Sequence, residues 1–322
     1  MYCNWGIIGP GFIATRAIIP AIQNASNSQV LAVASSNAQR ARDVSLHFGI
    51  ERSYTGYQRL LDDRDIDAVY IALPNHLHSE WTIRAAAARK HVLCEKPFAM
   101  NASECAGMIS ACNQAQVLLM EAVMYRFHPR MRYLKQMLLS HQLGDMRFLH
   151  AAFSFNFDAP DNYRAFKQFG GGALLDIGSY CVNAARWLLG SEPLALHGVT
   201  SYSRTEIDLM TSAILRFGED VMGHIQFSFI SAEHQVIEVI GTTGAVTAPL
   251  AFTAWRNDTT RLLFQYGQTF EEKEFEPSDP YKLMVEHFAA CVIENTPLLY
   301  PAEDGLANMR VLDKLTSVKD FQ

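Results

Sequence analysis

The stretch "GIIGPGFIA", residues 6–14, decides the fold of the first part of the chain. Gly9, Gly11 and Ala14 match the GxGxxG/A pattern and follow a short apolar run, which is the strand-to-helix context that this pattern requires. Glycines here let the backbone approach a pyrophosphate at the positive N-terminus of the next helix. An ordinary glycine turn is the alternative. Pro20 predicts that this helix is kinked or divided into short pieces.

Apolar runs alternate with helical patterns up to about residue 121. The strand-like runs are "WGIIG", "VLAVAS", "DAVYIAL", "HVLCEK" and "VLLMEAV", and the helical patterns are "NAQRARDVSLHFG" and "HSEWTIRAAAARK". Alternation of this kind predicts a parallel sheet, and continuous apolar runs are typical of strands that helices cover on both faces. We therefore expect a doubly wound α/β nucleotide-binding domain of Rossmann type over residues 1–121.

A different pattern follows over residues 122–322. A helix is predicted at "HPRMRYLKQMLLS", and strands at "MRFLHAAFSFNF", "LMTSAILRF", "VMGHIQFSF", "QVIEVIG" and "RLLFQYG". Further helices are predicted at "GALLDIGSYCVNAARWLLG", "PYKLMVEHFAACVIEN" and near "AEDGLANMRVLDKL". Short turns between the strands favour an antiparallel arrangement. We expect an α+β domain with an open, largely antiparallel sheet that binds the substrate and forms a dimer contact.

Composition excludes several classes of function. The 322 residues carry a net charge of -6 and no run rich in Lys or Arg, so neither nucleic acid nor an anionic membrane surface is an expected partner. No apolar run approaches the roughly 18 residues of a membrane span. Six cysteines without a CxxC pair indicate reduced thiols. The chain also begins without a basic, apolar leader, so we expect a cytoplasmic protein.

The end of the second predicted strand bears on the choice of dinucleotide. NAD sites usually place Asp or Glu there to accept from the ribose hydroxyls, whereas this strand closes with Ser35, Ser36 and Asn37. The two serines can donate to a 2'-phosphate and Arg40 can neutralise it. NADP is therefore favoured and NAD remains possible. In the alternative, Arg40 only solvates a helix face.

Lys96 follows the strand "HVLC" at the carboxyl end of the predicted parallel sheet, where ligands of such sheets bind. Pro97 biases Lys96 to an extended backbone, which allows the side chain to point toward the cofactor crevice. Glu95 can hold the lysine by charge pairing. The alternative is a strand-end ion pair in solvent, which is common for adjacent Lys and Glu residues.

A polar stripe marks the helix predicted over residues 172–190. Asp176, Tyr180 and Asn183 fall at i, i+4 and i+7, so they share one face. A tyrosine can take the hydroxyl proton of an alcohol while hydride leaves the same carbon, and a nearby ammonium favours the tyrosinate that this requires. In the alternative, the three side chains meet solvent or satisfy one another.

These stretches, with "ALPNHLHSEWTIRAAAARKHVLCEKP" and "MEAVMYRFHP", resemble the Gfo/Idh/MocA family of oxidoreductases over nearly the whole chain. Tyr180 stands where inositol dehydrogenases carry His, so dihydrodiol dehydrogenases and glucose-fructose oxidoreductase are closest in pattern. The resemblance implies hydride transfer between NAD(P) and the CH-OH group of a sugar, polyol or vicinal diol. It also implies a homodimer that pairs through one face of the C-terminal sheet.

The resemblance assigns roles to individual residues. The implied catalytic residues are Lys96, Tyr180 and Asp176. The implied cofactor contacts are Gly9, Gly11, Phe12, Ile13, Ser35, Ser36, Arg40, Leu73, Asn75, His78, Glu95, Lys96 and Arg126. The implied substrate contacts are Lys96, Asp176, Tyr180 and Asn183. No metal is expected, because His76 and His78 have no third ligand at a suitable spacing.

Two other functions stay open at this stage. Some members of the superfamily bind nucleotide and sugar without turnover, so the chain could be a regulator of the same fold. Retention of Lys96, Asp176 and Tyr180 favours catalysis. A glycosidase that uses NAD transiently would carry His in place of Tyr180, and no second acid pair is evident.

Overall fold

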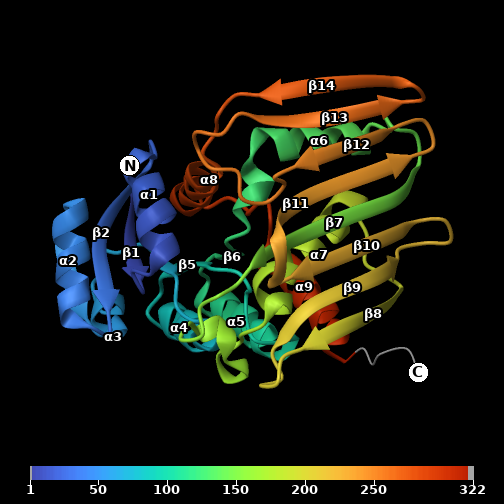
Figure 1. Cartoon of the computed structure of the whole chain (residues 1–322). Coiled ribbons are helices and arrows are strands. Elements are labelled where there is room, and N and C mark those ends of the chain that lie inside the picture. Colours follow the sequence, from blue (N-terminus) through green and yellow to red (C-terminus); the bar gives the residue numbers. More distant parts are fainter. Residues whose placement is uncertain (1, 318–322) are drawn as a thin grey trace. The chain divides into compact units, whose positions relative to one another are not determined.

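The computed structural model describes residues 2–317, and the chain divides into two compact units (Figure 1). The first unit comprises the chain up to Met124 together with Asp279–Leu306. The second comprises Tyr125–Ser278 together with the segment that begins at Ala307. No helix within the described residues combines the length and apolar content that crossing a membrane requires.

The first unit is built on a parallel sheet of six strands in the order β3-β2-β1-β4-β5-β6. The strands are β1 (Cys3–Ile8), β2 (Ser28–Ser35), β3 (Arg52–Thr55), β4 (Ala68–Ile71), β5 (His91–Cys94) and β6 (Leu119–Glu121). Their order reverses beside β1, which is the switch point where ligands of such sheets bind. The expected fold class of this half is confirmed.

The helices of this unit begin and end at recognisable signals. They are η1 (Ala14–Ile18), α1 (Ile19–Asn24), α2 (Ala38–Phe48), α3 (Tyr57–Leu61), η2 (Asn75–Leu77), α4 (His78–Ala87), α5 (Ala102–Ala115) and α8 (Pro280–Glu294). The first helix is divided as Pro20 predicts, because a π-helical turn precedes α1 and the proline occupies its first turn. Asn37 caps α2 by accepting from the Arg40 N–H.

The helix α8 belongs to the first unit, which differs from the expected boundary that gave residues 122–322 to one second domain. The helix joins this unit because its apolar face packs on the first sheet, where the ring of Phe288 lies 5.4 Å from that of Trp5 of β1. Glu286 also accepts from the backbone and hydroxyl of Ser26, at 2.9 and 3.1 Å. The chain thus returns to its first sheet after completing the second.

The second unit contains a sheet of eight strands in the order β14-β13-β12-β11-β7-β10-β9-β8. The strands are β7 (Met146–Asn156), β8 (Ala195–Tyr202), β9 (Asp208–Arg216), β10 (Met222–Ser228), β11 (Ile230–Gly241), β12 (Ala245–Pro249), β13 (Thr260–Tyr266) and β14 (Thr269–Phe275). All neighbours are antiparallel except β7 and β10, which run parallel. This confirms the expected open and largely antiparallel sheet.

Helices lie on one side of this sheet (Figure 1). They include α6 (Pro129–Leu139), which packs against β13, and the π-helical turn η6 (Leu174–Gly178) with α7 (Ser179–Leu189), which packs against β7 and β10. The chain ends in α9 (Ala302–Thr316). In β9, buried residues alternate with exposed Met210, Ser212 and Ile214, so the sheet presents these side chains on the face opposite α7.

Candidate active site

The glycine loop after β1 has the geometry of a phosphate cradle. Gly9 has φ +83°, and a Cβ there would lie 2.9 Å from the Ala72 carbonyl oxygen, so no other residue fits without strain. A Cβ added at Gly11 would lie 3.8 Å from the Ala72 carbonyl oxygen, the nearest neighbouring atom. The backbone of Gly11 therefore has room for the phosphate group of a bound ligand. Phe12 is exposed and Ile13 is half-buried at the start of the helix. The loop therefore fits a dinucleotide pyrophosphate.

The ribose end of the predicted site lies at the carboxyl end of β2. The Ser35 hydroxyl oxygen accepts from the Asn37 N–H at 3.1 Å, which leaves its own hydrogen to donate. Ser36 is exposed. Arg40 donates from Nε and Nη2 to the Pro10 carbonyl at 2.9 and 2.8 Å. This pair of bonds ties α2 to the glycine loop and places a cation between them.

His78 joins two loops at the same edge of the sheet. Its Nδ1 lies 2.8 Å from the Pro97 carbonyl oxygen and its Nε2 2.8 Å from that of Leu73. A neutral imidazole donates only one hydrogen bond, so the two carbonyls favour the protonated ring, whereas burial lowers the pKa of His78. Both ring nitrogens thus have backbone partners. Asn75, also predicted to bind the cofactor, is buried beside this loop.

Glu95 and Lys96 follow β5 at this carboxyl edge. The Glu95 carboxylate accepts from the Tyr70 hydroxyl with one oxygen and from the Lys96 backbone N–H with the other, at 3.2 Å. Lys96 itself is half-buried. The contact described between these neighbours is made by the Lys96 backbone, whereas the sequence led us to expect charge pairing with its side chain.

The second unit carries Asp176, Tyr180 and Asn183 on η6 and α7, and all three are buried. Tyr180 lies among aromatic rings, with centroids 5.7 Å from Phe153 and 5.5 Å from Phe252. Its shared face with Asp176 and Asn183 is interrupted by the π-helical turn, which the spacing of the residues did not predict.

Two of the predicted contacts are bound to each other within the second unit. The Asn183 side-chain oxygen accepts from the Tyr125 hydroxyl at 2.6 Å and from Arg126 Nε at 2.8 Å. The Arg126 guanidinium also lies 5.2 Å from the Trp187 ring centroid. These bonds give Asn183 and Arg126 a structural role, whatever contacts they make with ligands.

Arg164 contacts the predicted catalytic residue Asp176, and no motif of the sequence pointed to it. It donates from Nε and Nη2 to the two carboxylate oxygens of Asp176, at 2.8 and 3.1 Å. Such a bidentate pair fixes the orientation of the carboxylate. The arginine lies on the short 3-10 helix η4 (Tyr163–Ala165), so only the folded chain brings it to Asp176.

Asp208, at the start of β9, holds the beginning of η6. Its carboxylate accepts from the Leu174 N–H at 2.5 Å, and loss of hydration raises its pKa to about 7. Gly172 has φ +108°, and a Cβ there would lie 1.9 Å from Asp208 Oδ1. Gly178 likewise lets the helix approach the Phe227 ring. These contacts explain why glycine occupies positions 172 and 178 in the stretch that carries Asp176 and Tyr180.

Two family models match the chain. The model for an oxidoreductase family with an NAD-binding Rossmann fold matches residues 3–123, and the GFO/IDH/MocA C-terminal domain matches residues 131–247. The first covers the glycine loop and Lys96, and the second covers Asp176 and Tyr180. Both halves of the predicted site therefore lie in matched sequence.

Individual relatives match over most of the chain. The D-xylose 1-dehydrogenase (NADP(+)) 2 of Haloferax volcanii is 35% identical, covering 97% of this chain and 95% of its own. The mouse trans-1,2-dihydrobenzene-1,2-diol dehydrogenase is 33% identical, covering 76% and 74%. A solved 3-ketoreductase of Actinomadura kijaniata, in complex with NADP and TDP-benzene, has a TM-score of 0.94 and 29% identity, covering 99% and 98%. These matches confirm the expected class, an NAD(P)-dependent dehydrogenase, and the chain belongs to the GFO/IDH/MocA oxidoreductase family.

Proposed function

We propose that the chain transfers hydride between NADP and the CH-OH group of a sugar, polyol or vicinal diol. The observation that carries this proposal is the place of Lys96. It follows β5 directly, at the same carboxyl edge of the sheet as the glycine loop with its open Gly11. A cation at this edge lies in the unit that binds the nicotinamide cofactor.

The proposed reaction transfers one proton and one hydride. In oxidation, the hydroxyl proton of the substrate passes to the Tyr180 oxygen while hydride passes from the same carbon to the nicotinamide ring. The Lys96 ammonium favours the tyrosinate and binds the substrate oxygen. Asp176, fixed by Arg164, orients the substrate. In the reverse direction, Tyr180 donates the proton and the carbonyl is reduced.

The relatives support this class of substrate. Their names include a D-xylose dehydrogenase and a dihydrobenzene diol dehydrogenase. The ketoreductase similar to this chain was also solved with a lysine or a tyrosine replaced. The choice of NADP over NAD is supported by Ser35, Ser36 and Arg40, because no carboxylate ends β2.

The location of the protein is also proposed. We infer that it works in a reducing, cytoplasmic compartment, because all six of its cysteines are free and buried. Burial raises the pKa of the Cys112 thiol to about 12, which keeps it protonated and unreactive.

Substrate class and catalytic roles are tested together. Aldoses, polyols and vicinal diols are assayed with NADP by absorbance of the reduced nicotinamide, and the best substrate is used for variants. Lys96→Met and Tyr180→Phe should each lower turnover by about 10²- to 10⁴-fold, the usual loss of a positioned acid or base, while the Kd of NADP stays nearly unchanged.

The double variant and two contrary outcomes complete this test. Lys96→Met with Tyr180→Phe should cost little more than either change alone, because residues that act as a unit are not additive. Near-normal hydride transfer by Lys96→Met would remove this lysine from the mechanism. NADP binding without turnover on the whole panel would favour the regulator of the same fold.

A further inference from the structure

The Glu95 carboxylate lies in the interior of the first unit beside Tyr70. Tyr70 lies in the middle of β4 and is fully buried. Glu95 itself is 8% exposed. A carboxylate in such surroundings is stable as an anion only where hydrogen bonds and charges satisfy it.

The contacts of Glu95 point in two directions. One oxygen accepts from the Tyr70 hydroxyl, and the other accepts from the Lys96 backbone N–H at 3.2 Å. Burial and then the Glu95 charge raise the pKa of Tyr70. The Tyr70 phenol therefore keeps its proton at neutral pH and acts as the donor. The carboxylate thus connects the interior of the sheet to the backbone of Lys96.

The C-terminal part of the chain contacts this turn at one residue. Gly305 of α9 lies against Phe98, since a Cβ there would be 2.5 Å from the ring. Phe98 is itself fully buried. A segment far away in sequence therefore packs beside the turn that carries Lys96.

We propose that Tyr70 is a positioning residue of the reaction, which holds Glu95 so that the turn after β5 presents the Lys96 ammonium in one orientation. This inference rests on the proposed role of Lys96. Removing one hydroxyl leaves a buried carboxylate short of a donor, so the turn relaxes and the ammonium moves. A displacement of about 1 Å at a reacting group lowers turnover by up to about 10²-fold.

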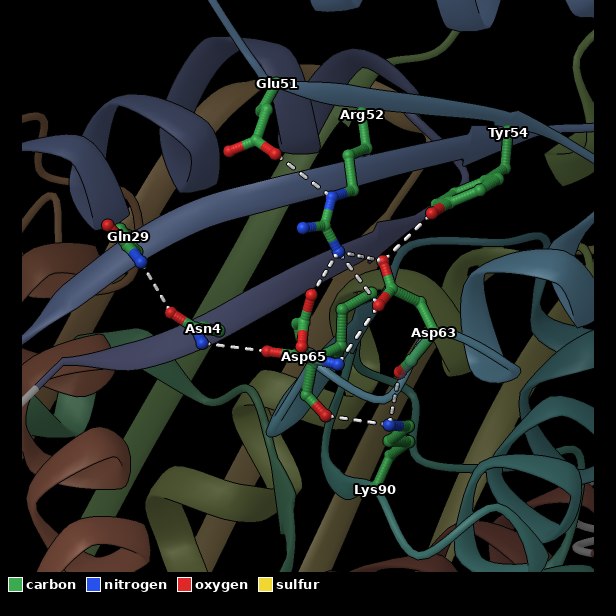
Figure 2. Close-up of polar contacts among 9 residues, drawn as sticks. Asn4, Gln29, Glu51, Arg52, Tyr54, Asp63, Asp65 and Lys90 are labelled. Atoms are coloured by element: carbon green, nitrogen blue, oxygen red, sulfur yellow. Dashed lines mark hydrogen bonds and ion pairs between the residues drawn. The ribbon is translucent and has the colours of Figure 1, made fainter.

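A second polar cluster of the same unit supplies a matched control (Figure 2). In it the Tyr54 hydroxyl donates to the Asp63 carboxylate at 2.9 Å, and Arg52 donates to the same carboxylate. Asp63 lies before β4, at the amino edge of the sheet, whereas Lys96 follows the carboxyl end of β5. Tyr54→Phe therefore removes a comparable bond between a phenol and a carboxylate, but away from the site.

The test compares Tyr70→Phe and Tyr54→Phe in the full chain with NADP and the best substrate. We expect Tyr70→Phe to lower kcat by about 10- to 100-fold with the Kd of NADP changed less than about twofold. Its kcat should also need a higher pH, because a misplaced ammonium no longer favours the Tyr180 anion. Tyr54→Phe should change only the denaturation midpoint.

Two outcomes separate this inference from the proposed function. If Tyr70→Phe keeps the kcat and pH profile of the wild type, the tyrosine only stabilises the fold and the inference is wrong, even where Lys96→Met is inactive. If Lys96→Met itself keeps turnover, the proposed function is wrong. Should Tyr70→Phe not fold, Glu95→Gln carries the test, and normal turnover with an unmoved pH profile in that variant would refute the inference.

Discussion

At the scale of a single residue, the choice of dinucleotide that we propose rests on Ser35. It ends β2, and its hydroxyl accepts from the Asn37 N–H. Ser35→Asp keeps an acceptor for that bond, repels a 2'-phosphate and accepts from ribose hydroxyls. We expect the ratio of NAD to NADP affinity to rise at least about tenfold, or about 1.4 kcal/mol. Fluorescence titration of both cofactors measures this.

The control for this change removes the hydroxyl without adding charge. Ser35→Ala should weaken NADP slightly and leave NAD affinity as it was, since it offers no acceptor to the ribose. A wild-type chain that binds NAD more tightly than NADP would contradict the roles given to Ser35, Ser36 and Arg40.

Single residues also show how far sequence reasoning reaches into the site. Gly9, Gly11 and Lys96 could be predicted because each has a fixed place relative to a strand that the apolar pattern reveals. Arg164 could not, because it reaches Asp176 through the tertiary fold. No spacing rule connects residues that meet only after the chain has turned.

The entry into α7 is the element that carries the proposed base. Asp208 holds the start of η6, and its pKa of about 7 lies above the ordinary value of 3.8. Between about pH 4 and 7 the unfolded chain therefore loses a proton that the native state keeps. This makes the contribution of Asp208 to stability fall as the pH rises through that window.

Asp208→Asn removes this titration while keeping an acceptor for the Leu174 N–H. Relative to the wild type, the variant should gain up to about 4 kcal/mol in the free energy of unfolding between pH 4 and pH 8. Urea denaturation at several pH values measures the difference, with exposed Asp220→Asn as the control. Equal pH dependence of Asp208→Asn and the wild type would mean that Asp208 ionises like an ordinary carboxylate.

Elements with strong local signals were predictable and others were not. Pro20 predicted the division between η1 and α1, and the apolar runs predicted β1, β2, β4 and β5. The helix α5 was not predicted, because its small residues give only a weak apolar stripe. The strand β14 was not predicted either, because it is charged and mostly exposed at the edge of its sheet, a composition that discourages pairing with other chains.

At the scale of the whole molecule, the order of segments along the sequence did not predict which unit each segment joins. Contiguous domains were the simplest expectation, yet α8 packs on the first sheet. The parallel pairing of β7 with β10, inside an otherwise antiparallel sheet, was not foreseen for the same reason. Both features depend on which apolar faces pack together in the folded chain. Local patterns of apolar residues do not specify this packing.

The large sheet bears on the oligomeric state that we propose, a homodimer. Val199 pairs with Ser212, and Val199, Met210 and Ile214 are 42 to 49% exposed on the face of the sheet opposite α7. Apolar side chains gathered on one sheet face are typical of a surface that another protein covers. The charged edge strand β14 disfavours association through that edge, so we expect pairing face to face.

Sedimentation equilibrium at micromolar concentration tests this arrangement. The wild type should have about twice the chain mass of 36.1 kDa. Ile214→Glu places a charge in the proposed interface without a designed partner and should reduce the mass to that of one chain, because an unpaired buried charge costs several kcal/mol. Leu46→Glu is the matched control, since Leu46 is 82% exposed on α2 in the first unit and its variant should remain dimeric. A wild-type mass near 36.1 kDa, or an Ile214→Glu variant that stays at twice that value, would show that this face does not form a dimer.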